Sequence, residues 1–364
     1  MRVLVTRTMD WYVRFERPIS SVSLVGGFVF DALTLKRVDL FWENLWVVAH
    51  IVAVAICIFI INLQENDGLD VKDYTKVHFW LINILQFFFG GLLSTFLVFY
   101  FRSTTLAVTW PFLFLLAAAF VANESFKKHY TRLAFQINLF FLSLLSFSIF
   151  IVPVYFHRIG RDVFLISGFT SFAVLGLFLA LLGLFAREKF KKSKKILIFS
   201  ISGIFLTTNI LYFFNLIPPI PLSLKDRGVF HFLARDASGN YVVEFEDAGW
   251  LGYFAPRENF HWVEGTPIYA YSAIFSPASF NTDIIHEWQK YDDGAGLWVT
   301  ASRINLTAIG GREGGYRTYS MKKNITPGEW RVNVETAQRQ IIGRLRFDVI
   351  AVEEEPTLKS IIKK

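Results

Sequence analysis

The sequence has little cysteine and little charge. The only cysteine among its 364 residues is Cys57, which lies in an apolar run, so the chain can form neither an intramolecular disulfide nor a cysteine metal cluster. Charged residues make up 18%, hydrophobic residues make up 53%, and the mean hydropathy is +0.41, which is too apolar for an ordinary soluble protein. The composition predicts a polytopic membrane protein.

Phenylalanine and charge divide the chain into two unlike parts. Of the 40 phenylalanines, 32 lie in residues 1–221 and 8 in residues 222–364. Lysine and arginine exceed the acidic residues by 8 in the first part and fall short by 1 in the second. The positive charge therefore belongs to loops that flank apolar segments. Nucleic-acid binding is not expected, because it needs basic residues gathered on a soluble face.

Catalytic motifs are also lacking. The sequence contains no Gly-x-Ser-x-Gly elbow, no defensible pair of glycosidase carboxylates and no Ser-Lys arrangement. His286 and Glu287 do not begin a zinc-binding helix, because no second histidine follows at the required spacing. We expect a protein that is not an enzyme and that holds no cofactor or metal.

Apolar runs of about 20 residues, the length needed to cross a bilayer, occur six times. They cover residues 40–61, 78–101, 105–121, 135–156, 163–185 and 196–216. A seventh candidate, residues 18–35, is shorter and contains Asp31, so a span, a re-entrant segment and an interfacial helix are all open readings. Counting it as a span puts most loop lysines and arginines on one side, above all those of a predicted loop at residues 187–195. This predicts seven helices in the cytoplasmic membrane, with the N-terminus in the cytoplasm and the C-terminal part outside.

Polar side chains within apolar spans are costly and are therefore functional candidates. The three titratable ones are Asp31, Glu43 and His50. Asp31 has two interpretations: a relay group or partner of Arg37 or His50, or a carboxylate at the headgroup level where a span ends. His50 could shuttle protons or be a buried histidine bonded to a helix neighbour.

Three prolines in residues 218–221 follow the last apolar run and predict a stiff linker between residues 1–217 and residues 222–364. The second part alternates polar and apolar residues between turn residues, as strands do. Seven candidate strands cover residues 229–234, 241–246, 268–275, 297–304, 317–322, 330–336 and 341–352. We expect an all-β antiparallel sandwich of immunoglobulin-like size with a short, solvated, charged C-terminal tail.

Four separated motifs in this part resemble a bacterial family, domain of unknown function 2914. They are His286-Glu287-Trp288, Arg317-Thr318-Tyr319-Ser320, Gly328-Glu329-Trp330-Arg331-Val332 and Gly343-Arg344-Leu345-Arg346-Phe347. The resemblance covers roughly residues 284–350 and implies a domain that often follows a multi-span membrane region, without a known activity. Gln338-Arg339-Gln340 departs from the family's usual Asp-Gly turn.

Two binding features are predicted in this β domain. Gly310–Gly315 could form a nest of backbone N–H groups for an anion beside Arg312 and Arg317, or be only a glycine-rich loop. His286, Trp288, Tyr316, Tyr319 and Trp330 could line an aromatic platform for a sugar, or pack in the core.

The leading functional hypothesis is a membrane-anchored envelope protein whose β domain binds or senses a glycan or protein partner. The alternative is a transporter or intramembrane enzyme that uses Asp31 and His50.

Overall fold

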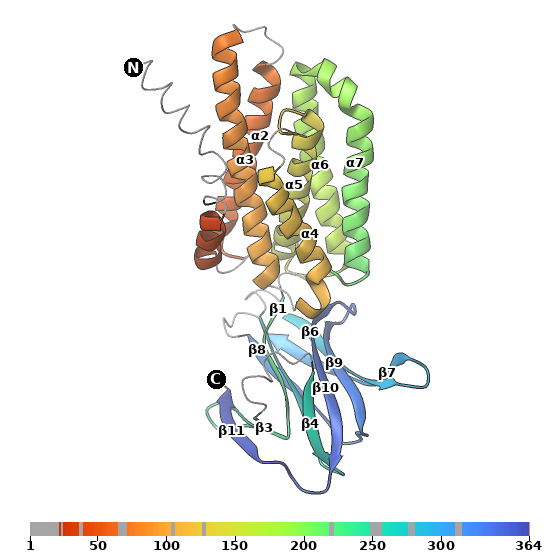
Figure 1. Ribbon diagram of the computed structural model, residues 1–364. Coiled ribbons are helices and arrows are strands. Elements are labelled where there is room, and N and C mark those ends of the chain that lie inside the picture. Colours follow the sequence, from red (N-terminus) through yellow and green to blue (C-terminus); the bar gives the residue numbers. More distant parts are fainter. Residues whose placement is uncertain are drawn as a thin grey trace. The chain divides into compact units, whose positions relative to one another are not determined.

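The computed structural model describes residues 22, 25–35, 39–64, 71–102, 106–125, 129–217, 222–247, 257–275, 281–309 and 315–363. The chain divides into two compact units, a helical one and one that consists mainly of Ile217–Lys364 and contains all the described strands. Both units are drawn in Figure 1. The predicted proline linker, residues 218–221, lies outside the described residues.

The helical unit is an up-and-down arrangement of apolar helices (Figure 1). The six long ones are α2 Phe41–Gln64, α3 Val71–Arg102, α4 Leu106–Ser125, α5 Leu133–Phe156, α6 Arg161–Phe185 and α7 Arg187–Phe213. Within the described residues, five segments are long and apolar enough to cross a membrane: Phe41–Leu63, Val77–Phe101, Leu133–Phe156, Arg161–Phe185 and Phe190–Phe213. Val25–Thr34 and Trp110–Val121 are apolar helices of shorter length. Helices thus occur at all seven predicted places, but the seven-span count is not confirmed.

Aromatic packing and amide hydrogen bonds hold these helices together. Phe150 of α5 packs against Phe96 and Tyr100 of α3, with ring centroids 6.0 and 4.5 Å apart. Asn62 Nδ2 donates to Gln136 Oε1 at 2.8 Å and so joins α2 to α5. Large apolar side chains on the outer surfaces of α6 and α7 remain exposed, including Phe169 and Phe199. A phenylalanine-rich sequence therefore fills the interior and also covers the outside, as in a lipid-facing bundle.

The basic segment at residues 187–195 is helical, so the predicted loop is wrong. Only Ala186 separates α6 from α7, and its N–H donates to Leu182 O at 2.8 Å. Lysine, arginine and glutamate are good helix formers, and the segment continues without interruption into the apolar part of α7. High charge alone does not indicate a loop.

The β unit contains three sheets (Figure 1). Its strands are β1 Ser223–Phe230, β2 Phe232–Arg235, β3 Tyr241–Glu246, β4 Glu258–Val263, β5 Ile268–Phe275, β6 Asn281–Asp292, β7 Leu297–Ile309, β8 Tyr316–Lys322, β9 Gly328–Thr336, β10 Ile341–Val352 and β11 Leu358–Lys363. The strand orders are β1-β5-β8, β4-β10-β9-β6-β7 and β11-β3-β2. The predicted all-antiparallel sandwich is not confirmed, since β4 pairs with β10 in parallel and the sheets number three within the described residues.

Strand β5 is buried on both faces. Ala270 and Ile274 join a core with side chains of the five-stranded sheet, including Trp288, Trp330 and Phe347. Tyr271 and Ala273, on the opposite face, join a second core with Val243 of β3. The sheet β1-β5-β8 is therefore a middle layer between the other two.

Strands β4, β6 and β11 were missed from the sequence, and β1 and β2 were predicted as one strand at residues 229–234. Strand β6 carries polar residues on both faces, and the alternation of β4 covers only its last four residues, so neither gives a clear signal. The C-terminal tail is exposed at most positions, but it is not an irregular end, because β11 pairs with β3 from Leu358↔Glu246 to Lys363↔Tyr241. That pairing depends on backbone hydrogen bonds, which side-chain periodicity does not report.

Candidate functional site

His286 is fully buried between the middle and five-stranded sheets, where it joins residues from three strands. Its Nε2 lies 2.8 Å from Ser272 Oγ on β5, and its Nδ1 lies 2.8 Å from Ser320 Oγ on β8. Trp288 Nε1 donates to the same Ser320 Oγ at 2.9 Å. The His-x-Trp motif and the serine that ends Arg-x-Tyr-Ser thus form one hydrogen-bonded cluster inside the core.

Burial lowers the pKa of His286 to about 3 from its ordinary value of 6.5. The ring is neutral in the folded protein, whereas an unfolded chain would take up a proton near pH 6.5. Its contribution to stability is therefore present above about pH 6.5 and is lost as pH falls toward 3. A neutral, enclosed imidazole bonded to two hydroxyls supports the fold and does not face a ligand.

The other family motifs also shape the core. Trp330 and Phe347 lie in the same cluster as Trp288. Gly343 packs so closely on β1 that a Cβ there would overlap the side chain of Leu224. These contacts explain the glycine, tryptophan and phenylalanine of the last two motifs, and they leave Arg331 and Arg344 to be explained.

Both arginines lie on the outer face of the five-stranded sheet, above a layer of bonded polar groups. Arg331 Nε donates to Gln289 Oε1 at 2.6 Å, and Arg344 Nε donates to Asn333 Oδ1 at 2.7 Å. Asn333 Nδ2 in turn donates to Glu287 Oε2 at 3.1 Å. Glu287, Gln289 and Asn333 are buried, so this layer is held in a fixed arrangement.

The polar layer includes two carboxylates that share one arginine. Arg303 lies 2.6 Å from Glu335 Oε1 and 3.3 Å from Glu287 Oε1. Burial, followed by repulsion from Glu287, raises the pKa of Glu335 to about 7, although Arg303 and Arg339 act in the opposite direction. Glu335 therefore changes charge near neutral pH.

Arg331, Arg344 and Arg346, here called the arginine cluster, form a concentration of like charge on this face. Arg346 is directly opposite Arg331 in the β9–β10 register. Burial and repulsion from Arg344 and Arg346 lower the pKa of Arg331 to about 10. The Arg331 guanidinium also lies over the ring of Trp298, 4.2 Å from its centroid. Sequence alternation in residues 330–336 and 341–352 indicated this polar face. Glu287 and Gln289, which bond to it, could not be assigned to the same face because strand β6 was not predicted.

The remaining predicted residues of the β domain lie elsewhere. Tyr316, Arg317 and Tyr319 lie on β8. The Arg317 guanidinium lies over the Tyr241 ring at 5.7 Å, and the Tyr319 ring is 6.0 Å from that of Tyr241. Arg312 lies outside the described residues. The structure therefore does not bring the predicted platform together, since His286 and Trp288 are in the core and Tyr319 is in a separate aromatic group.

In the helical unit, Asp31 and His50 are both buried and are close enough to interact electrostatically. His50 Nδ1 lies 3.0 Å from Trp46 O, and its ring packs where Gly91 leaves room. Glu43 is half-buried in the first turn of α2, where the helix dipole favours a carboxylate. The structure thus brings two of the three titratable candidates of the apolar helices near each other, without a hydrogen bond between them among the described contacts.

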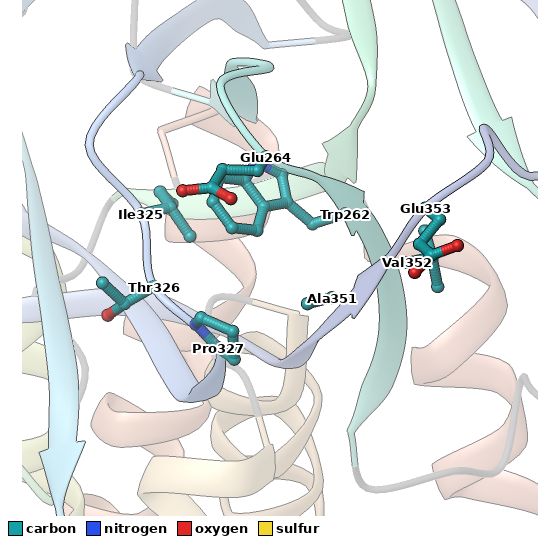
Figure 2. A pocket seen from close by; sticks show the side chains of 8 residues that line it. All are labelled: Trp262, Glu264, Ile325, Thr326, Pro327, Ala351, Val352 and Glu353. Atoms are coloured by element: carbon teal, nitrogen blue, oxygen red, sulfur yellow. The ribbon is translucent and has the colours of Figure 1, made fainter.

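A shallow pocket of about 470 Å³ lies elsewhere on the β unit (Figure 2). It is lined by Trp262, Glu264, Ile325, Thr326, Pro327, Ala351, Val352 and Glu353. Figure 2 shows the indole of Trp262 beside the carboxylate of Glu264. Within the described residues, no group of three or more His, Cys, Asp and Glu side chains could hold a metal ion.

The chain thus combines apolar helices long enough to cross a membrane with a mixed β domain. Within that domain, residues 281–349 match the model of a family described as "Protein of unknown function (DUF2914)", which confirms the resemblance seen in the motifs. The match runs from β6 into β10 and includes the arginine cluster as well as His286, Trp288 and Ser320, whereas Ser272 lies before it.

A comparison with curated proteins finds no significant match. Solved structures that align include a β-glucosidase from Listeria innocua in complex with gluconolactone, with 12% identity over 34% of this chain and a TM-score of 0.18. The alignment spans only 16% of that enzyme. Another is the alkylpurine DNA glycosylase AlkC of Pseudomonas fluorescens, bound to DNA containing an abasic site analog, with 8% identity over 86% of this chain and 99% of that one and a TM-score of 0.22. At such scores, neither carries an argument about fold or function.

Proposed function

We propose that the protein is a bacterial cytoplasmic-membrane protein whose β domain is a binding module on the extracytoplasmic side. The helical unit crosses the membrane seven times, with residues 18–35 and α4 as the two shorter spans and the N-terminus in the cytoplasm. The β domain, in which sheets pack face to face, engages a glycan or protein of the envelope.

The outer face of the five-stranded sheet is the observation that carries this proposal. The two cores are built from buried apolar side chains, and neither core includes the arginine cluster. Placing like charges directly opposite one another costs stability, and such costs concentrate where a protein binds something. A charged surface that is supported by a fixed layer of hydrogen-bonded side chains is suited to binding a ligand.

Topology is tested by cysteine labelling in spheroplasts, which is simple because Cys57 is the only cysteine. In a Cys57→Ser background, a cysteine added after Lys364 is expected to react with a membrane-impermeant maleimide. Lys192→Cys is expected to react only after permeabilisation. A C-terminal cysteine that stays unlabelled until permeabilisation would overturn the extracytoplasmic placement.

A second candidate function is transport or intramembrane catalysis, which the proximity of the buried Asp31 and His50 favours. It predicts that neither Asp31→Asn nor His50→Ala rescues the phenotype of a deletion strain, although each variant protein still accumulates. Full rescue by both variants would exclude this function. Rescue by a variant that lacks the arginine cluster as well would count against both proposed functions.

A further inference from the structure

The arginine cluster has more hydrogen-bond donors than the protein itself uses. Arg331 and Arg344 each bond through Nε to a buried amide oxygen. Within the described residues, no hydrogen bond to the protein occupies the terminal guanidinium nitrogens of either arginine, and Arg346 is exposed with no carboxylate bonded to it. The guanidinium groups of Arg331 and Arg344 are thus each held at one edge, and their other N–H groups bond no protein group among the described residues.

Nearby carboxylates do not neutralise this charge. Glu287 attracts Arg331 and Arg344 but bonds Arg303, Thr300 and Asn333. The acids Glu329 and Asp348 pair with Arg257. An excess of guanidinium over carboxylate, with donors in the fork geometry that matches an oxyanion, is complementary to phosphate or carboxylate.

Aromatic and polar groups beside the cluster narrow the class of ligand. Trp298 is half-buried next to Arg331, and Tyr291 lies edge-on to Trp298 with ring centroids 5.3 Å apart. Thr300 adds an exposed hydroxyl on the same face, while Gln289 and Asn333 are bonded to one another in the buried layer beneath it. Flat apolar surface beside such groups suits a sugar ring, and the arginines suit an acidic substituent on it.

We propose that Arg331, Arg344 and Arg346 form an oxyanion site that binds an acidic sugar of a glycan through its phosphate or carboxylate group. This inference rests on the proposed binding function and names its ligand class. The arginines hold the charged group, and Trp298 packs along the sugar.

The test uses the full chain in detergent and three polymeric probes: phosphomannan, polygalacturonate and neutral dextran. Two double variants remove equal charge. Arg331→Gln with Arg346→Gln changes the site, and Arg235→Gln with Lys323→Gln changes exposed positions on other elements. Wild type should bind one acidic polymer at least about 10-fold more tightly than dextran. The site variant should lose at least about 10-fold, and the control variant less than about 2-fold.

The acidic polymer that binds decides between phosphate and carboxylate. Equal losses in the two double variants would overturn the inference, because they would mean that only the net charge attracts the polymers. Equal binding of acidic polymers and dextran would overturn it as well. Since the topology labelling is independent of ligand, an extracytoplasmic domain that fails this test would leave the binding proposal standing with another ligand class.

Thermal unfolding separates misfolding from loss of binding. The site variant removes the repulsion between Arg331 and Arg346 but also the hydrogen bond from Arg331 to Gln289 and the contact with Trp298, so we expect it to keep a cooperative unfolding transition close to that of wild type. A site variant that lost binding only together with its cooperative unfolding transition would contradict the assignment.

Discussion

Arg331 and Arg346 are direct cross-strand partners in the β9–β10 ladder. Neither has a carboxylate bonded to it among the described residues, and Glu287 is the nearby acid that favours the charge of Arg331. Opposed like charges destabilise a sheet by about 0.2–1 kcal/mol. We therefore expect Arg346→Gln to raise the free energy of unfolding by about 0.5 kcal/mol, measured by denaturant unfolding in detergent. Arg346→Lys keeps the charge and should leave stability unchanged. A loss of stability in Arg346→Gln would mean that Arg346 has a structural partner.

The hydrogen-bond cluster around His286 predicts unequal effects of two serine substitutions. Ser320→Ala removes the acceptor of the Trp288 indole N–H and a partner of His286, so it should cost about 1–3 kcal/mol. Ser272→Ala removes only one partner of His286 and should cost less. Thermal unfolding of the two variants gives the comparison, and equal costs would show that the indole bond contributes little.

The raised pKa of Glu335 predicts a pH-dependent stability. The folded protein keeps the Glu335 proton up to about pH 7, whereas the unfolded chain releases it near 4.5. The contribution of Glu335 to stability should therefore fall as pH rises between these values, by up to about 3 kcal/mol. It is measured as the difference between wild type and Glu335→Gln, because His286 contributes an opposite slope below about pH 6.5. Glu335→Gln should remove this dependence and be more stable than wild type at pH 8. The control Glu329→Gln, at a partly exposed position, should keep the slope. An unchanged slope in Glu335→Gln would assign it to another group.

The close approach of β10 to β1 predicts that Gly343→Ala is destabilising. A methyl group there would overlap Leu224, and overpacking typically costs about 1–3 kcal/mol. Adding Leu224→Ala should make the double variant less unstable than the sum of the single changes, because the overlap is relieved. A double-mutant cycle in denaturant measures this coupling, and strict additivity would argue against the contact.

Strand β11 predicts a structural role for the end of the chain. Lys363 pairs with Asp226 at 2.6 Å, and Arg317 donates to Lys363 O at 2.9 Å. Ending the chain at Thr357 should lower the melting temperature and speed hydrogen exchange of the β3 amides that pair with β11. Exchange in β9, which is remote from β11 in the strand order, serves as the internal reference. Unchanged protection of β3 would mean that β11 is dispensable.

Several parts of the fold follow from local sequence alone. Long apolar runs predicted the places of all the described helices, because a helix satisfies its own backbone and needs only a compatible local sequence. Alternation similarly predicted β3, β5, β9 and β10. It also placed Trp330 and Arg331 on opposite faces, as the structure has them.

The residue roles in the candidate site follow from sequence less well. The sequence leaves both a binding role and a core role open for His286 and Trp288, and only their bonds to Ser272 and Ser320 decide between the two. Those serines lie 14 and 34 residues from His286, a separation over which no periodicity operates. The arginine cluster was missed for the same reason, since its meaning depends on the register that brings Arg331 opposite Arg346.

The sequence by itself thus determined an apolar helical part, a β part beyond it and the motifs of one family, because these depend on composition and short-range periodicity. Only the tertiary structure decided that the motif histidine is enclosed and that the motif arginines face outward. Strand register brings distant side chains to one face or into one core, and that pairing depends on the fit of the whole domain and not on any local pattern.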